Sequence, residues 1–440
     1  MFQSRYPLKT LGLLITSGAL LAACGLSSTD SLEPLPDGES FSDPSLRQFP
    51  YPYDAMLAIS TDIDATAYHD FKETHRYMNT KEETSMGTGL GLDIANSFWM
   101  YVDTDKEGKI DARESTTWRE QMSYFNTDWE TPFLAEEIRT YIEGGWIDTL
   151  HSYGDFSQAD RETANFERKH AKAAIEELEE HDIEIQVWTN HGNQANIQNF
   201  GGSYSFTDYQ EGDTPDTDGY HTDLIVPYGV EFLWDSNGHA EIGHDSVLYP
   251  IELQDGQSIW GFKRFTHIYT DEEKDWLWGA HDLNRQLSED RLDSLVEEGH
   301  YSVIAQHLGN IIEDEAFPDQ TVEALTRLRD YQENEDILVA RTSRLLEYNR
   351  NHDYLSYSTE TTDTYKDIHI HEVEDPVHGT FTPELDQLRG FTFEVSHPER
   401  TRLYLDGERI SKEELTTEES GMIGITWFEP DYTDYTEKIH

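Results

Sequence analysis

The stretch "WIDTLHSYGDFSQADRETANFERKHAKAAIEELEEHDIEIQVWTN" (residues 146–190) decides the fold class of this chain. Residues 146–152 begin with apolar side chains and end with polar ones, and we predict a strand there. Residues 158–181 repeat apolar side chains at the period of a helix, and residues 183–190 alternate as a second strand. A strand, a helix and a strand in succession predict two parallel strands covered by the helix.

The same alternation continues on both sides of this stretch. Strand–helix alternation over about 300 residues predicts an α/β fold with a parallel sheet and covering helices, and the number of units suits a closed barrel. We interpret the run 96–102 and the turn at 103–109 as part of an inserted hairpin. Further strands are predicted at 54–60, 230–235, 301–308 and 336–341, and further helices at 135–145, 289–299, 319–333 and 342–352.

The end of the chain has a different pattern. Short alternating segments replace the strand–helix units, and Asp406-Gly407 is a dipeptide typical of hairpin turns. We therefore assign residues 49–352 to the barrel and residues 353–440 to a small all-β domain that resembles a β-sandwich. The alternating segments cover residues 389–397, 401–410 and 421–428.

The N-terminal residues resemble a bacterial secretion signal. A short basic segment precedes an apolar run over 11–23, which has the length expected of a signal and is too short to span a bilayer. The run ends in Leu-Ala-Ala-Cys24, which resembles the lipobox whose cysteine is cleaved free and acylated. We predict a lipoprotein signal over 1–24 and a flexible tether over 25–48, with an unacylated signal peptide as the alternative.

Lipidation at Cys24 predicts a location in the cell envelope. Acyl chains would hold the protein at a membrane, facing the periplasm or the exterior, and at the outer membrane if the host is of the Gram-negative type. Cys24 is the single cysteine of the chain, so no intramolecular disulfide is possible.

The charge balance is strongly acidic. The chain has 88 acidic and 32 basic residues and a formal net charge of −56. Such a surface repels phosphate backbones, so we expect no nucleic-acid partner, and no feature predicts a protein partner. The acids are spread along the chain, and molar salt, with a Debye length of about 3 Å, would remove most of their repulsion. We infer a salt-loving host; a polyacidic cation store is the less favoured alternative, because long acidic runs are missing.

Polar side chains gather where the predicted barrel strands end. In parallel α/β barrels the reactive groups lie at the carboxyl ends of the strands. Carboxylates, imidazoles and an indole therefore reach the same edge of the sheet. These residues are Asp62, Asp64, His151, Asp155, His191, Trp234, Asp235 and His307.

Three of these residues are predicted to bind a metal. Asp64, His151 and Asp155 would supply the three protein ligands of a catalytic site, with Zn²⁺ expected first and Co²⁺, Ni²⁺ or Mn²⁺ as alternatives. Such an ion activates water and polarises a carbonyl. Asp62 is then placed to act as the base, and His307, from the far side of the barrel, to protonate the leaving group.

Four short motifs resemble the polysaccharide deacetylases of the NodB-homology class, also called carbohydrate esterase family 4. "TDID" (61–64) is similar to the motif with a base and a metal aspartate, with one residue inserted, and "HSYGD" (151–155) is similar to the second motif, with Asp in place of its final His. "LWD" (233–235) is a candidate for the fourth motif, and "AQH" (305–307) matches the fifth only at its histidine. The resemblance covers roughly residues 50–350 and implies a distorted (β/α)7 barrel.

The third motif of that family carries an arginine that orients the base, and "WTNHG" (188–192) has none. His191 or Arg264 could replace it. We predict that His191, Trp234 and Asp235 contact the substrate.

The resemblance implies hydrolysis of acetyl groups, by N- or O-deacetylation, from an envelope or extracellular polysaccharide. Two alternatives stay open. The protein could be an inactive carbohydrate-binding lipoprotein, or a related hydrolase that acts on another C–N or glycosidic bond.

A separate acidic segment, "DTDKEGKIDARE" (103–114), fits most positions of a calcium-binding EF-hand loop. Its flanks do not predict two good helices, so an ordinary EF-hand is not expected. Calcium at 103–114 is a prediction, and an acidic hairpin tip is the alternative.

Overall fold

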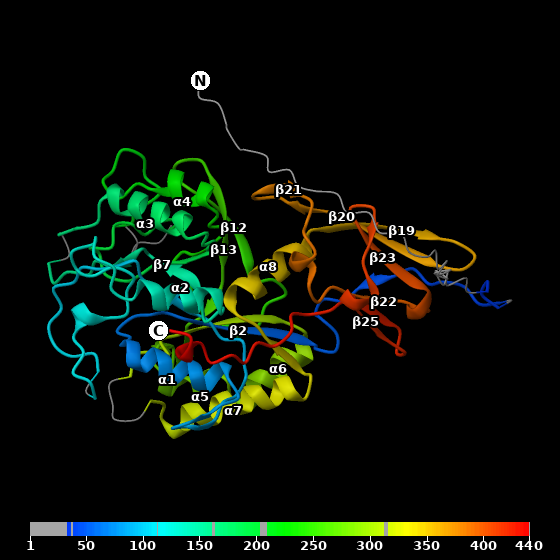
Figure 1. The fold of residues 1–440 in the computed structure, drawn as a ribbon, viewed down its shortest axis with the longest axis horizontal. Helices are drawn as coiled ribbons and strands as arrows, with labels where there is room; N and C mark the ends of the chain where they lie inside the picture. The colour runs from blue at the N-terminus through cyan, green and yellow to red at the C-terminus, as the bar shows by residue number, and fades with distance from the viewer. Residues whose placement is uncertain are drawn as a thin grey trace, which may run out of the picture.

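The computed structural model describes residues 33–36, 38–111, 113–160, 163–202, 209–311 and 316–439. The predicted signal over 1–24 and its lipidation site Cys24 lie outside the described residues. Figure 1 shows a larger part, in which helices cover a curled sheet, and a smaller part made of the C-terminal strands. In the described ranges no helix has both the length and the apolar character that crossing a membrane requires.

The larger part is a mixed α/β fold around one strongly curled, mostly parallel sheet of half-barrel shape. Ten of its strands follow one path, β11-β14-β17-β2-β5-β7-β9-β10-β13-β12, and β18 pairs with β2 beside this path. Only the pair of β12 with β13 is antiparallel among the described pairs of this sheet. The strands are β2 (Ala55–Thr61), β5 (Asn96–Phe98), β7 (Ile147–His151), β9 (Val187–Thr189), β10 (Phe232–Trp234), β11 (Gly238–His239), β12 (Leu248–Glu252), β13 (Ser258–Phe262), β14 (Arg264–Phe265), β17 (Tyr301–Gln306) and β18 (Ile337–Val339).

Strand β2 is the centre of this sheet. All seven of its residues are buried, and it pairs in parallel with β17 from Met56 opposite Tyr301 to Thr61 opposite Gln306. A strand covered on both faces can be apolar on both, which explains the nearly continuous apolar sequence of β2. The polar residues that follow β2 and β17 consequently leave the sheet at the same edge.

The covering helices bury one apolar stripe each. Helix α3 buries Ala171, Ala174, Ile175 and Leu178, which recur at intervals of three and four residues. It begins at Arg168, ten residues later than predicted, and Gln158 at the predicted start instead donates from Nε2 to the carbonyl oxygen of Asp103. The helices are α1 (Tyr68–Asn79), α2 (Ala135–Glu143), α3 (Arg168–Glu180), α4 (Thr222–Tyr228), α5 (Leu283–Gln286), α6 (Glu289–Glu298), α7 (Asp319–Glu333) and α8 (Thr342–Asp353).

The predicted hairpin at 96–109 is wrong. Strand β5 instead enters the curled sheet in parallel with β2 and β7, and β6 (Tyr101–Val102) pairs in parallel with β8 (Gly154–Asp155). Phe98, Trp99 and Met100 are fully buried. A strand of three residues has too little sequence to show a period, so its place in the barrel depends on its neighbours.

The C-terminal strands form two small sheets that are antiparallel except where β20 pairs with β23. The β1 strand pairs with β22, so Ser45 and Leu46, in the segment predicted as a tether, belong to one of these sheets. One sheet contains β1 (Ser45–Leu46), β22 (Thr392–Glu394), β26 (Met422–Ile425) and β25 (Leu415–Glu418); the other contains β19 (Leu355–Thr361), β20 (Lys366–Asp375), β21 (Gly379–Phe381), β23 (Thr401–Leu405) and β24 (Glu408–Arg409).

The two parts share a hydrophobic core. Phe232 and Trp260 of the barrel belong to the same buried cluster as Leu345 of α8 and Ile368 and Phe393 of the C-terminal sheets. Helix α8 accordingly lies between the two parts (Figure 1). Burial of this cluster removes apolar surface from water on both sides, which stabilises the contact.

Candidate metal centre

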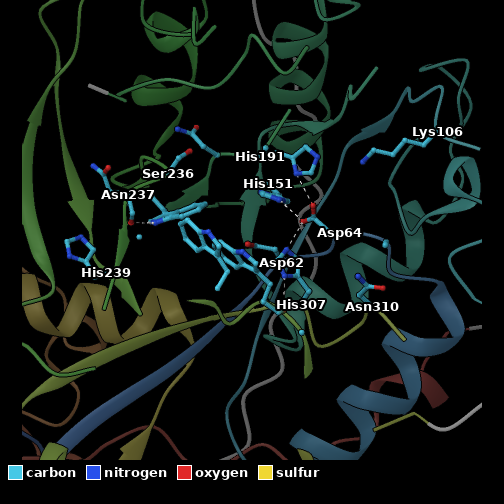
Figure 2. Close-up of a pocket in the computed structure, with 18 of the residues that line it drawn as sticks. Asp62, Asp64, Lys106, His151, His191, Ser236, Asn237, His239, His307 and Asn310 are labelled. Carbon is cyan, nitrogen blue, oxygen red and sulfur yellow. Dashed lines mark hydrogen bonds and ion pairs between the residues drawn. The ribbon is translucent and has the colours of Figure 1, made fainter. Parts of the chain in front are cut away.

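A cavity of about 880 Å³ opens at the carboxyl ends of the parallel strands. Asp62 and Asp64 follow β2, His151 ends β7, His191 follows β9 and His307 follows β17. All five residues line the cavity, and Figure 2 shows them gathered around Asp64. The parallel pairing of the strands therefore brings residues far apart in the sequence to one point, as the sequence predicts.

Asp64, His151 and His191 form a compact group of potential metal ligands. Asp64 Oδ2 lies 2.9 Å from His151 Nε2, and Asp64 Oδ1 lies 2.9 Å from His191 Nδ1. One ligand atom from each residue lies within 4.8 Å of the other two. One carboxylate and two imidazoles are a donor set that suits zinc and similar ions.

The orientation of His151 supports a cation at this place. Its Nδ1 lies 3.0 Å from the carbonyl oxygen of Thr189 and 2.8 Å from the hydroxyl of the same residue. A carbonyl can only accept, so Nδ1 carries a proton and donates it. The other nitrogen, Nε2, then turns its lone pair toward a carboxylate oxygen of Asp64 when the ring is neutral, and a cation relieves that repulsion.

The predicted ligand Asp155 lies one side chain farther away. Its Oδ1 is 3.3 Å from His191 Nε2, on the side of the ring away from Asp64. The carboxylate is fully buried and also accepts from the backbone N–H of Ser157 and from Gln121 Nε2. The structure therefore brings His191, which was predicted to contact the substrate, into the ligand group, and Asp155 holds the His191 ring in place.

The electrostatics of the group favour an ionised carboxylate. Burial acts to raise the pKa of Asp64, but the charges and hydrogen bonds of His191 and His151 hold it well below its usual range. Burial likewise acts to lower the pKa of His191, but Asp64 and Asp155 raise it to about 10. Binding of a metal to His191 therefore releases a proton, because only the neutral imidazole is a ligand.

Asp62, the predicted base, is held by Arg264. Asp62 Oδ2 lies 3.0 Å from Arg264 Nη2, which also donates to the carbonyl oxygen of Ser60 at 2.7 Å. Arg264 belongs to β14, is fully buried, and lies over the Trp234 ring at 4.6 Å. Of the two predicted replacements for the missing arginine, the structure brings Arg264 and not His191 into contact with Asp62.

His307 points into the cavity from the end of β17, the strand that pairs with β2, and not from the far side as predicted. Its Nδ1 donates to the carbonyl oxygen of Trp278 at 2.9 Å, which fixes the ring, and its Nε2 lies 3.7 Å from Asp64 Oδ2. Asp62, Asp64 and His307 also lie within 4.8 Å of one another when one atom is taken from each. The two predicted catalytic residues thus flank the ligand group.

Of the two predicted substrate contacts at the end of β10, Trp234 reaches the cavity and Asp235 does not. Trp234 lines the cavity. Asp235 is buried beside it, and its oxygens accept from the backbone N–H and side-chain amide of Asn237 and from the hydroxyl of Tyr249. Asp235 therefore stabilises the turn after β10, and the structure does not bring it to the cavity surface.

Two cavity residues were missed by sequence reasoning. The rings of Trp276 and Trp278 stack, with their centres 5.0 Å apart and an interplanar angle of 14°. Both residues line the cavity. Trp276 ends a hairpin of β15 (His267–Thr270) and β16 (Glu273–Trp276), outside the curled sheet. A search limited to barrel strand ends could not find them, although the pattern Trp-Leu-Trp at 276–278 is a signal for a one-sided aromatic surface.

The acids of the segment 103–114 accept hydrogen bonds from this loop and from residues 159 and 165. Asp103 accepts from Asn165 Nδ2, Asp105 from the backbone N–H of Ala159, and Asp111 from the backbone N–H groups of Arg113 and Glu114. Among the residues that the structure describes, no three acids of this segment converge on one point. Calcium there stays a prediction.

Another histidine group lies at the rim of the cavity. His239, Glu241 and His244 bring ligand atoms within 4.8 Å of one another. The ammonium of Lys263 lies 3.5 Å from His244 Nδ1. A positive charge so close opposes a second cation, so we assign no metal to this group.

Comparison with known proteins adds no assignment. No protein-family model matches the chain, and no curated protein matches it significantly. The geometry of the cavity is therefore the basis of the functional assignment that follows.

Proposed function

We propose that this protein is a metal-dependent hydrolase that removes acetyl groups from a polysaccharide. In this proposal the curled sheet is a distorted (β/α)7 barrel of the polysaccharide deacetylase type. The observation that carries it is the convergence of Asp64, His151 and His191 with Asp62 and His307 in one cavity. These five residues come from the ends of four different strands or from the loops after them, as catalytic groups of barrel enzymes do.

Asp64, His151 and His191 would hold the metal. When bound, a divalent ion there supplies Lewis acidity, which lowers the pKa of water and polarises the acetyl carbonyl. Thr189 orients His151 and Asp155 orients His191, so that each ring presents one nitrogen to Asp64. Partners of this kind keep a metal-binding imidazole in the correct tautomer and position.

Asp62 would accept the proton of the attacking water. Its Oδ2 is held by Arg264, while its Oδ1 is buried and has no hydrogen-bond partner among the described residues. A buried acceptor without a partner is costly, and a water or substrate hydrogen at Oδ1 removes that cost. Arg264 holds the carboxylate in one orientation, which is the role expected of the arginine of the third motif.

His307 would protonate the leaving amine or alcohol. The bond from Nδ1 to the Trp278 carbonyl leaves Nε2 facing the cavity, so a proton carried at Nε2 is available to the substrate. One atom from each of Asp62, Asp64 and His307 lies within 4.8 Å of the other two, so the base and the acid are both close enough to act on one acetyl group.

The aromatic wall of the cavity supports a sugar substrate. Trp234, Trp276 and Trp278 present indole rings to the same space. Flat aromatic faces offer apolar surface to the C–H faces of sugar rings at a small entropic cost. Together with the predicted lipid anchor at Cys24, this wall supports an envelope or extracellular polysaccharide as the substrate.

The test is metal content and acetate release from one preparation. The protein in molar KCl is expected to contain one divalent ion per chain, with zinc first and cobalt, nickel or manganese as alternatives, and to release acetate from acetylated oligosaccharides. His151→Ala should lose both properties. The matched control is His371→Ala, because His371 is exposed on β20 in the C-terminal part.

Other outcomes separate the alternatives. Acetate release that survives His151→Ala would refute the proposal. Metal without acetate release would favour a hydrolase acting on another bond. Oligosaccharide binding without metal or acetate would favour a carbohydrate-binding protein.

A further inference from the structure

The charged residues that line the cavity do not follow the composition of the chain. The whole sequence has 88 acidic and 32 basic residues. Among the described residues that line the cavity, the only acids are Asp62 and Asp64, which both belong to the proposed catalytic group. Apart from the histidines, the basic residues of this lining are Lys106 and Lys274.

Lys274 lies on the aromatic wall. Its Nζ is 3.9 Å from the centre of the Trp276 ring, and its charge acts on His239, which lines the same wall. In the described part of the chain no carboxylate lies within 4.0 Å of this ammonium. In so acidic a protein, a cation without an acidic partner at the mouth of a cavity is available to an anion of the substrate.

Lys106 lies on the other side of the metal group. Figure 2 shows Lys106 and His239 on opposite sides of Asp64, His151 and His191. The Nζ of Lys106 lies 4.5 Å from the centre of the Trp118 ring and 3.8 Å from Asp155 Oδ2. Asp155 also accepts from Gln121 and Ser157 and contacts His191, so Lys106 is one of several partners that share this carboxylate.

Long-range attraction does not explain these two cations. A net charge of −56 repels an anionic polymer, and molar salt screens charges beyond about 3 Å. Under those conditions only contact pairs discriminate between ligands, and contact pairs form where a cation stands inside the cavity. A neutral glycan would need the indoles but neither ammonium.

We propose that the substrate is an anionic glycan, whose carboxylate or sulfate groups pair with Lys274 on one side of the acetylated residue and with Lys106 on the other. This inference rests on the proposed function, because it names the substrate class of the same cavity. The sugar ring between the two anionic groups stacks on Trp276 and Trp278, and its acetyl group reaches the space between Asp62, Asp64 and His307.

The test compares acetylated oligosaccharides of equal length on the full-length protein in molar KCl. One is neutral, one alternates with a uronic acid, and one carries sulfate groups. The unmodified protein should prefer an anionic substrate, and the arm with the higher kcat/KM identifies carboxylate or sulfate as the recognised group. Lys274→Gln should lower kcat/KM for that substrate about threefold to tenfold, mainly through KM, and leave the neutral substrate unchanged. Lys106→Gln should lower kcat/KM more for the anionic than for the neutral substrate, because Lys106 also contacts Asp155 behind His191.

Two variants serve as controls. Lys274→Arg keeps the charge and should retain most of the preference. Lys172→Gln removes a lysine of α3 whose side chain is 67% exposed and pairs with Glu176, and it should change neither substrate. Equal kcat/KM for neutral and anionic substrates, or an equal loss for both in Lys274→Gln, would overturn the inference.

Failure of the proposed function gives a different result. If no substrate releases acetate, calorimetric binding of the same oligosaccharides decides. Tighter binding of an anionic one that Lys274→Gln abolishes would support the inference, and equal or undetectable binding of all three would overturn it.

Discussion

Two pairs of buried histidines in the larger α/β part have opposite environments. We call His151 and His191 the site histidines. Their exposed fractions are 1% and 6%, and both rings face the carboxylate of Asp64. We call His75 and His221 the core histidines. Both are fully buried among aromatic rings: the ring centre of Phe71 lies 4.2 Å from that of His75, and the ring centre of Trp188 lies 5.3 Å from that of His221.

The comparison separates burial from chemistry. Burial lowers the pKa of His75 to about 3 and that of His221 to about 4, so both core histidines are neutral parts of the packing. Burial acts in the same direction on His191, yet two carboxylates raise its pKa to about 10. A buried histidine is therefore a candidate for function when a carboxylate, and not only an aromatic ring, occupies its surroundings.

The largest expected effect comes from removing the shared carboxylate of the site histidines. Asp64→Asn keeps the shape but removes the charge that both rings face. Acetate release should fall about a thousandfold, as expected for the loss of several kcal/mol of transition-state stabilisation, together with the metal content. Atomic absorption and an acetate assay on the same sample measure both. If Asp64→Asn retains metal and activity, a facing carboxylate does not distinguish the site histidines from the core histidines.

A smaller loss is expected when only the orientation of a site histidine is disturbed. Asp155→Asn replaces the carboxylate behind His191 and should weaken metal affinity about 10- to 100-fold. Titration with a competing chelator measures this affinity. The control is Asp148→Asn, a buried aspartate whose Oδ2 accepts from the backbone N–H of Ser343 away from the cavity. An equal loss of affinity in the control would contradict a specific role for Asp155.

The core histidines should affect how the free energy of unfolding changes with acidic pH. The pKa of His75 is about 3 in the folded state against 6.5 in the unfolded state. Protons therefore bind the unfolded chain preferentially, and the stability that neutral His75 contributes is present above pH 6.5 and is lost as the pH falls toward 3. His75→Gln should lessen the loss of unfolding free energy between pH 7 and pH 4.5 by about 2 kcal/mol.

Denaturant unfolding at the two pH values, in the same salt, measures this difference. Gln offers one amide oxygen that accepts and one amide group that donates, as the neutral His75 ring does with its two nitrogens, which lie 3.4 Å from Asn79 Nδ2 and Asn96 Nδ2. If wild type and His75→Gln lose stability in parallel over this interval, His75 is not neutral in the folded protein. Metal content at pH 7 should be the same in both, because His75 is not in the ligand group.

The smallest expected effect concerns the second contact of His151. Thr189→Val removes the hydroxyl at 2.8 Å from Nδ1 but keeps the carbonyl at 3.0 Å. Loss of one of two such bonds is expected to cost about 1 kcal/mol, or about fivefold in metal affinity. Competition with the same chelator measures it, and a loss as large as that of Asp155→Asn would show that the hydroxyl and not the carbonyl fixes the ring.

Sequence reasoning found most residues of the site because their types are rare at strand ends. Asp62, Asp64, His151 and His307 follow long buried runs whose period is visible without a structure. The third potential metal ligand, after Asp64 and His151, depends on the direction of the side chains in the turns at 151–155 and 189–192. Ser152 and Tyr153 in the first turn adopt positive φ angles, which redirects the chain toward Asp155 and which composition does not indicate.

The amino-acid sequence alone determined the alternation of strands and helices, the acidic surface and the edge at which the reactive groups gather. These properties follow from local periods and from composition, which need no knowledge of distant contacts. The tertiary structure alone decided that His191 replaces Asp155 beside Asp64, that Arg264 supports Asp62, and that Trp276 and Trp278 form one wall of the cavity. These contacts join segments far apart in the chain, and their distances depend on the curl of the sheet and the course of the loops, which no local pattern encodes.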